Sequence, residues 1–137
     1  MNEQDLLLRT KSFALRVIAL VAALPNSVAG RKIGDQLVRA GTSVGANYRA
    51  ACRGRSRAEF AAKLGVVEEE ADESAYWMEL IVEANLLRAS RVDKLHDEAE
   101  QIRNIVARSR LTAMRNAKVS TARSSIANRK SQIANVV

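Results

Sequence analysis

The sequence predicts an all-α protein: an antiparallel, up-down-up-down four-helix bundle followed by a disordered C-terminal tail. Three observations support this prediction. Apolar residues recur at intervals of three and four over long segments, which is the spacing of one helix face. The 137 residues include a single proline, Pro25, so helix breakers are rare. The connections between the apolar segments are short, and short connections make consecutive helices antiparallel.

The first predicted helix covers residues 4–24. Its inward face is apolar apart from one threonine and consists of Leu6, Thr10, Phe13, Val17, Leu20 and Leu24. Pro25 ends this helix, because the residue before a proline is pushed out of helical geometry. Residues 25–27 therefore form a tight connection to the next helix.

The second predicted helix covers residues 29–53, and its inward face is lined by Ile33, Leu37, Ala40, Val44, Asn47 and Ala51. A buried amide costs free energy unless it is hydrogen-bonded, so the placement of Asn47 on this face is predicted to serve a specific structural purpose. The helix also contains Gly34, Gly41 and Gly45, each of which costs about 1 kcal/mol relative to alanine. These glycines indicate close approach of a neighbouring helix; the alternative is a locally irregular helix.

The third predicted helix runs from residue 57 to about residue 87. Ser56 and Glu59 have the spacing of a capping box, which satisfies free amide groups at a helix start. The inward face consists of Phe60, Leu64, Val67, Ala71, Ser74, Met78 and Ile81. A second apolar stripe lies beside it and consists of Trp77, Leu80, Ala84 and Leu87. One bundle seam does not need both stripes, so we expect the second to contact another subunit.

The fourth predicted helix covers residues 92–114, which places the bundle domain at residues 1–117. Residues 118–137 form the predicted tail. In this tail the sequence Arg-Ser-Ser-Ile-Ala-Asn at 123–128 recurs as Lys-Ser-Gln-Ile-Ala-Asn at 130–135. Two copies with one isoleucine each bury too little apolar surface to order the chain. The tail is therefore expected to be disordered and basic.

Charge is unevenly distributed along the chain, whose net charge is +7. Residues 30–55 hold six basic residues and one acid, whereas residues 57–88 hold eight acids and three basic residues. Residues 118–137 add four basic residues and no acid. A basic excess of this kind favours contact with nucleic-acid phosphates.

Residues that serve common catalytic chemistries are scarce. Cys52 and His96 are the only cysteine and histidine, so neither a disulfide nor a zinc cluster can form within the chain. Cys52 is interpreted as a small buried thiol. The acidic run from Glu68 to Glu73 is interpreted as a solvated helix face, because Asp93 rather than a glutamate precedes His96 at di-iron spacing. We therefore predict no enzymatic activity, no cofactor and no metal.

The candidate nucleic-acid-binding residues cluster where the second helix meets the third. Arginines would contact phosphates there, and a tyrosine beside them would stack on a base: Arg49, Arg53, Arg55, Arg57 and Tyr48. The alternative is that these arginines form ion pairs with the acids of the adjacent third helix. Both interpretations hold together if some of the arginines pair and others stay unpaired.

A second polar group is predicted in the bundle itself. Arg39 lies mid-helix beside the inward face, and a buried arginine requires a carboxylate partner. Glu70 or Glu73 is the expected partner from the third helix. Together with Asn47, these residues form a predicted structural polar core.

One stretch carries the pattern of a known family: Gln36-Leu37-x-Arg39-Ala40-x-x-Ser43-x-x-x-Asn47, then Arg53-Gly54-Arg55-Ser56, then an acidic helix with Glu73 and Trp77. Over about residues 8–112 the chain resembles the four-helix bundle proteins of the 23S rRNA-intervening-sequence family. That family is also similar to the accessory bundle proteins of diversity-generating retroelements, which are basic pentamers that bind nucleic acid and a reverse transcriptase.

The resemblance implies a small bacterial bundle that assembles as a homo-oligomer, often a pentameric ring, and has no enzymatic activity. The chain departs from the pattern at Ala50, where the family usually has a glutamate. Any ion pair that uses this acid is therefore absent, and Arg39 must find its partner on the third helix.

The sequence thus predicts a non-enzymatic, oligomeric helical bundle that associates with RNA or another nucleic acid through its basic turn. The alternative function is a protein-interaction scaffold that docks a partner, such as a nucleic-acid enzyme, without direct nucleic-acid contact. The lone thiol fits a reducing cytosol, and no segment has the order of a signal peptide or the length of a membrane span. A cytoplasmic location without membrane contact is therefore expected.

Overall fold

Four helices form the part of the chain that the computed structural model describes, which is residues 1–136, with side chains to residue 133. They are α1 (Glu3–Ala22), α2 (Val28–Cys52), α3 (Arg57–Glu83) and α4 (Ala89–Val136). No strand occurs among these residues. The predicted all-α class and the predicted number of helices are confirmed.

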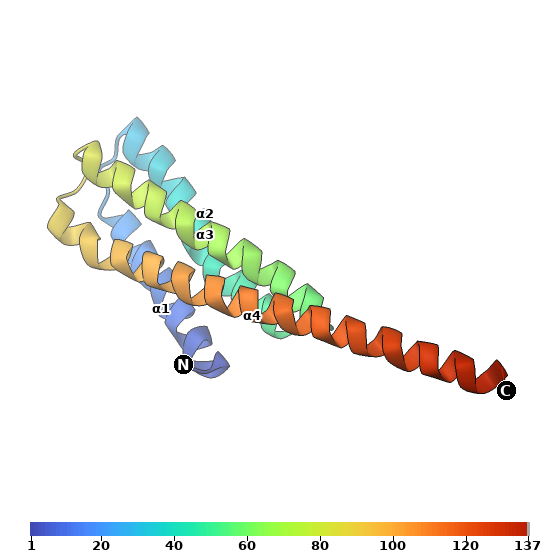
Figure 1. Ribbon diagram of the computed structural model, residues 1–137. Helices are drawn as coiled ribbons and strands as arrows, with labels where there is room; N and C mark the ends of the chain where they lie inside the picture. Colours follow the sequence, from blue (N-terminus) through green and yellow to red (C-terminus); the bar gives the residue numbers. More distant parts are fainter. Residues whose placement is uncertain (137) are drawn as a thin grey trace.

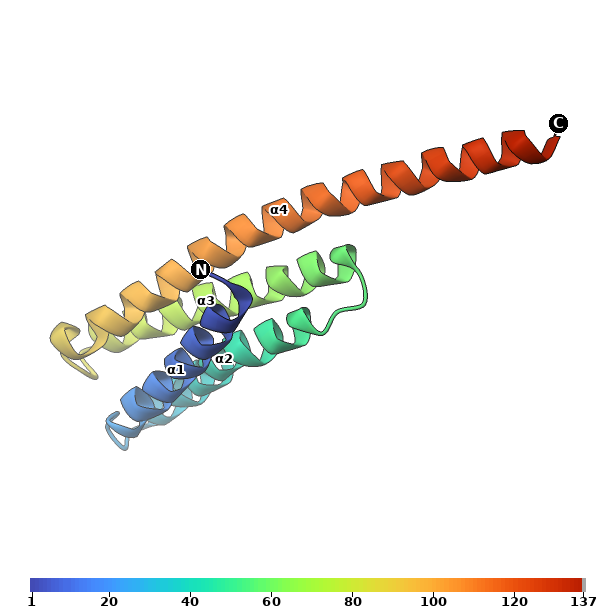
Figure 2. The ribbon, with the colours of Figure 1, turned by 90° about the horizontal axis from the view of Figure 1, so that it is seen from below.

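The helices pack as an antiparallel bundle (Figures 1 and 2). α1 packs on α2, α2 on α3 and α3 on α4, and α1 also contacts α4. Arg9 of α1 and Glu98 of α4 form an ion pair of 2.6 Å at this last contact. The α2–α3 connection and the point where α4 leaves the bundle lie at the same end of the molecule (Figure 2).

The core follows the apolar stripes of all four helices. Phe13 and Val17 of α1, Leu37 of α2, Leu64 of α3 and Ile102 of α4 are fully buried. The remaining core residues are mostly alanine, valine, leucine and isoleucine. Burial of this aliphatic surface is the main favourable term in the stability of the bundle.

The interior glycines of α2 face α1. A Cβ atom at Gly41 would lie 2.8 Å from both γ carbons of Val17, and one at Gly34 would lie 3.1 Å from a γ carbon of Val21. At Gly45 it would lie 3.3 Å from the backbone oxygen of a residue of α1. The glycines therefore allow α1 to approach the backbone of α2 closely, as predicted, and α2 stays continuous through them.

α3 ends at Glu83, earlier than the predicted residue 87. Asn85 adopts the left-handed conformation with φ of 59°, and the Leu86 amide donates a hydrogen bond of 2.9 Å to the Ile81 carbonyl. This is a Schellman motif, with asparagine at the position that glycine usually occupies. Leu87 consequently lies in the α3–α4 connection instead of on a helical stripe.

α4 continues without a break to Val136, whereas the sequence predicted a disordered tail from residue 118. Its distal part, residues 115–136, projects past the α2–α3 connection as a single rod (Figures 1 and 2), and we call it the arm. Residues 90–136 contain neither glycine nor proline, and extending an existing helix carries no new nucleation cost. Val137, the last residue of the predicted tail, lies outside the described residues.

Candidate nucleic-acid interface

The four predicted arginines surround the α2–α3 connection. Arg49 lies in the last turn of α2, Arg53 caps its C-terminus, Arg55 lies in the connection, and Arg57 is the first residue of α3. All four are exposed. Ser56 fixes the connection, because its hydroxyl accepts a hydrogen bond of 3.0 Å from the Glu59 amide at the start of α3.

None of these four guanidinium groups forms a hydrogen bond or ion pair with a residue that the structure describes. Four acids of α3 pair with arginines of other helices instead, namely Glu68, Glu70, Asp72 and Glu73. Arg103 of α4 contacts Asp72 at 2.7 Å, and Arg110 of α4 contacts Glu68 at 2.7 Å. The alternative of ion pairing between the turn arginines and α3 is therefore not what the structure contains. We call Arg49, Arg53, Arg55 and Arg57 the basic turn.

Arg39 of α2 lies against both carboxylates that the sequence suggested. It donates a hydrogen bond of 3.2 Å to Glu70 and a second, shorter one to Glu73. The indole nitrogen of Trp77 also donates to Glu73, at 3.1 Å. The hydrogen bond from Arg39, followed by that from Trp77, holds the pKa of the Glu73 carboxyl below its usual value. Because the Arg39 side chain is about half exposed, this network lies at the surface and not in the core.

Tyr48 is not available to a nucleic acid, so its assignment as a stacking residue is wrong. Only 5% of Tyr48 is exposed, and it belongs to the hydrophobic core. Burial, together with the neighbouring Cys52, raises the pKa of its hydroxyl. Tyrosine at this position completes the inward face of α2, one residue beyond the predicted Asn47.

Asn47 is partly buried and makes its hydrogen bond within its own helix. Its side-chain amide donates to the Ser43 carbonyl at 2.8 Å. This hydrogen bond satisfies the amide within α2, and Asn47 lies at the edge of the inward face. Cys52 is also partly buried, and burial raises the pKa of its thiol. A raised pKa favours the protonated form, which is a poor nucleophile.

His96 of α4 lies between two carboxylates. Its Nε2 is 2.8 Å from Glu79 of α3, and its Nδ1 is 3.2 Å from Glu100 of α4. Among the residues that the structure describes, no group of three or more histidine, cysteine, aspartate or glutamate side chains is arranged to hold a metal ion.

The stripe predicted to contact another subunit is partly covered by the chain itself. Trp77, Leu80 and Leu87 are half-buried, while Ala84 is exposed. A different apolar row, which the sequence reasoning did not single out, lies on the outer face of α1: Leu8, Leu15 and Ile18, of which Leu15 is 62% exposed. The spacing of seven and three residues was the signal that could have found it.

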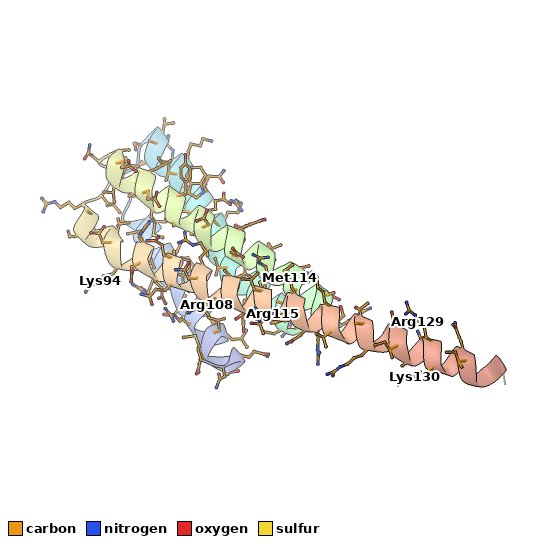
Figure 3. The ribbon with its side chains drawn as sticks, in the orientation of Figure 1. Lys94, Arg108, Met114, Arg115, Arg129 and Lys130 are labelled. Carbon is orange, nitrogen blue, oxygen red and sulfur yellow. The ribbon has the colours of Figure 1, made fainter. Side chains whose placement is uncertain are left out.

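α4 adds cations to the end of the bundle that carries the basic turn. Arg57 and Phe60 of α3 line an open groove together with Arg108 and Thr112 of α4. Figure 3 shows Arg108 and Arg115 on the middle of α4, with Arg129 and Lys130 further along the arm. Residues 101–133 contain eight basic residues and no acid. Sequence reasoning missed Arg108, although the predicted antiparallel pairing of the third and fourth helices was the signal that could have placed it beside the start of α3.

Comparison with known proteins identifies the family. The model of the 23S rRNA-intervening sequence protein family matches residues 2–108. The chain belongs to this family. The match covers the bundle and stops before the arm, so α4 continues beyond the part that the family shares.

A solved structure has the same fold. It is the crystal structure of a protein with unknown function from the S23 ribosomal protein family of Bacteroides thetaiotaomicron, with 30% sequence identity and a TM-score of 0.67. The similarity covers 74% of this chain and 94% of that one. A search of curated proteins finds no match. No helix among residues 1–136 is both long and apolar enough to cross a membrane.

Proposed function

We propose that this bundle is a non-enzymatic nucleic-acid-associated protein, and that the basic turn contacts the phosphates of an RNA. The observation that carries the proposal is the unpaired state of the turn arginines. Other arginines of this chain, such as Arg39, Arg103 and Arg110, are paired with carboxylates. An arginine without a protein partner keeps its full set of donors for phosphate oxygens.

The basic turn provides positive charge, but its predicted aromatic residue is not exposed for stacking on a base. Tyr48 is buried, so the contacts are with phosphates and carry little sequence information. Each phosphate contact releases counterions, which makes the affinity fall steeply as salt is added. The name of the family, which refers to 23S rRNA, is consistent with RNA as the ligand.

The test compares two variants with the same loss of charge. Arg53→Gln/Arg55→Gln/Arg57→Gln removes three cations from the basic turn. Arg88→Gln/Arg91→Gln/Lys94→Gln removes three exposed cations from the other end of the bundle, where α3 connects to α4. Fluorescence anisotropy with a labelled single-stranded RNA at low salt is expected to show at least a tenfold weaker affinity for the turn variant only. Equal affinities of the two variants would contradict the proposal.

The exposed row on α1 supports a second candidate, a protein contact. Leu8, Leu15 and Ile18 are large apolar side chains exposed on one side of α1, and exposed apolar side chains grouped on one face favour a protein-interaction surface. We propose a second copy of this chain as the occupant, since an oligomer multiplies the weak attraction of each basic turn for a long polyanion. A scaffold that docks a different protein through this row is the alternative, and a heteromeric complex that survives nuclease treatment would support it.

A further inference from the structure

The arm carries its charge and its apolar residues on one side. Successive helical residues are about 100° apart, so Val119, Ile126 and Ile133 share one face with Ala122. Four of the five cations of the arm flank this row, with Lys118 and Arg129 on one side and Arg123 and Lys130 on the other. The fifth, Arg115, lies in line with the row at its N-terminal end. The opposite face holds uncharged residues, among them Ser120, Ser124 and Ser131.

This face does not continue the seam of the bundle. Val106 and Ala113 are the last buried residues of α4, and the same 100° spacing puts the arm's apolar row on roughly the opposite side of the helix. From Lys118 to residue 133 every residue of the arm is exposed. The arm therefore presents a separate surface that the bundle neither covers nor uses.

We propose that the arm is a second nucleic-acid-binding element and that it lies in the major groove of double-stranded DNA. Charge complementarity is the first argument: five cations and no acid lie within a rod about 22 Å long from Arg115 to Lys130, which corresponds to about six base pairs. A second copy of the arm would bring like charges together.

Shape supports a duplex with a wide groove. An α-helix with its side chains is about 10–12 Å across, and the major groove of B-form DNA is about 12 Å wide. The major groove of an RNA duplex is too narrow and deep for this. The arm contains no aromatic residue on which the bases of a single strand could stack. In the groove, the flanking cations reach phosphates on both walls, and Val119, Ile126 and Ile133 face base edges such as the methyl group of thymine.

Composition argues against a lipid surface as the occupant. Helices that bind membrane interfaces usually carry tryptophan, phenylalanine or leucine on the buried face. The arm has only three large aliphatic residues there, spaced one per two turns. Its affinity for lipid would therefore rest on charge alone.

The experiment uses the full chain and two matched variants. Arg123→Gln/Arg129→Gln/Lys130→Gln removes three cations from the arm, and Ser120→Gln/Ser124→Gln/Ser131→Gln changes the opposite face. Both introduce glutamine, a good helix former, so the arm keeps its helix propensity. Affinity for a B-form DNA duplex and for an RNA duplex of the same sequence is measured as a function of salt.

The cations of the arm are expected to contribute more to the affinity for the DNA duplex than to the affinity for the RNA duplex. The cation variant is expected to lose at least tenfold in DNA affinity, and its slope of log affinity against log salt becomes shallower by about 2.7. The serine variant keeps both values. Replacing thymine by uracil in the duplex removes the methyl groups and weakens binding several-fold.

This inference concerns a surface separate from the basic turn, so the two proposals fail separately. The variant Arg53→Gln/Arg55→Gln/Arg57→Gln tests RNA binding by the turn, and the arm variant tests DNA binding. An arm variant with unchanged DNA affinity and salt slope would overturn the inference. So would an equal loss of affinity for the DNA and RNA duplexes in the arm variant, or arm-dependent binding to phosphatidylserine vesicles in place of DNA.

Discussion

At the scale of single residues, the arginines differ in whether they form an ion pair with a carboxylate of the chain. Arg39, Arg103 and Arg110 tie α2 and α4 to the acids of α3, while no guanidinium group of the basic turn forms an ion pair with a described residue. The sequence could suggest Glu70 and Glu73 for Arg39, since all three lie midway along adjacent helices. It could not assign Asp72 and Glu68 to Arg103 and Arg110, because those pairs depend on how α4 is rotated against α3.

The Glu73 network gives a pH-dependent contribution to stability. The folded state holds the pKa of Glu73 below its usual value, so the contribution is complete above the unfolded pKa and disappears as pH falls through the folded one. Glu73→Gln is expected to lower the urea midpoint of unfolding at about pH 7 and to have a smaller effect at about pH 3, because the contribution is lost as pH falls. The control is Glu69→Gln, which changes an exposed carboxylate and is expected to leave the midpoint unchanged at both pH values. A loss for Glu73→Gln that grows on acidification would contradict this account.

Gly41 tests the close approach of α1 and α2. A methyl group there would lie 2.8 Å from both γ carbons of Val17, so Gly41→Ala is expected to destabilise the fold by about 1–3 kcal/mol. Gly65→Ala is the matched control, because the nearest atom, Cδ of Arg110, is 3.6 Å away and alanine favours the helix by about 1 kcal/mol. Chemical denaturation measures both changes, which should have opposite signs. A stabilising Gly41→Ala would show that the two helices are further apart.

Among the site residues, the sequence predicted where each residue lies along its helix better than it predicted whether the side chain is buried or exposed. The four arginines are exposed as expected, but Tyr48 is buried and Asn47 lies at the edge of the inward face. A shift of one residue turns a helix by about 100°, which is enough to exchange core and surface for two neighbours. Only the packing of α2 against α1 and α3 decides which of the two is inside.

At the scale of elements, helix existence was predictable and helix ends were not. The periodicity that predicts a helix extends over about twenty residues or more, so the existence of each of the four helices can be predicted from the sequence. The end of α3 depends on one residue, Asn85, whose left-handed conformation stops the helix early. The predicted disordered tail is helical to residue 136. An isolated segment would have to nucleate its own helix, whereas the arm extends α4, which is already nucleated in the bundle.

The arm is expected to contribute nothing to the stability of the bundle. Ala113 is the last buried residue of α4, and residues 118–133 are all exposed. A chain that ends at residue 117 should therefore unfold within about 2 °C of the full chain. Calorimetry on both proteins makes the comparison. A clearly lower midpoint for the shorter chain would mean that the arm folds back on the bundle or joins copies of it.

At the scale of the whole molecule, three surfaces have no partner among the described residues: the basic turn, the arm and the outer face of α1. The apolar row on α1 is the expected contact between copies. Leu8→Gln/Leu15→Gln should shift the native mass toward the monomer, because two exposed apolar side chains are lost from the contact. Leu111→Gln removes an apolar side chain of similar exposure from α4 and should leave the mass unchanged. If the α1 variant keeps the wild-type mass, the contact between copies lies elsewhere, for example at the stripe that contains Trp77.

The salt dependence of RNA binding tests the central claim, that the arginines of the α2–α3 connection are the cations that meet phosphate. Replacing Arg53, Arg55 and Arg57 by glutamine should make the slope of log affinity against log salt shallower by about two, which is the value for three phosphates of a single strand. The variant that lacks Arg88, Arg91 and Lys94 should keep the wild-type slope. Two identical slopes would show that the basic turn does not touch the nucleic acid and would contradict the account.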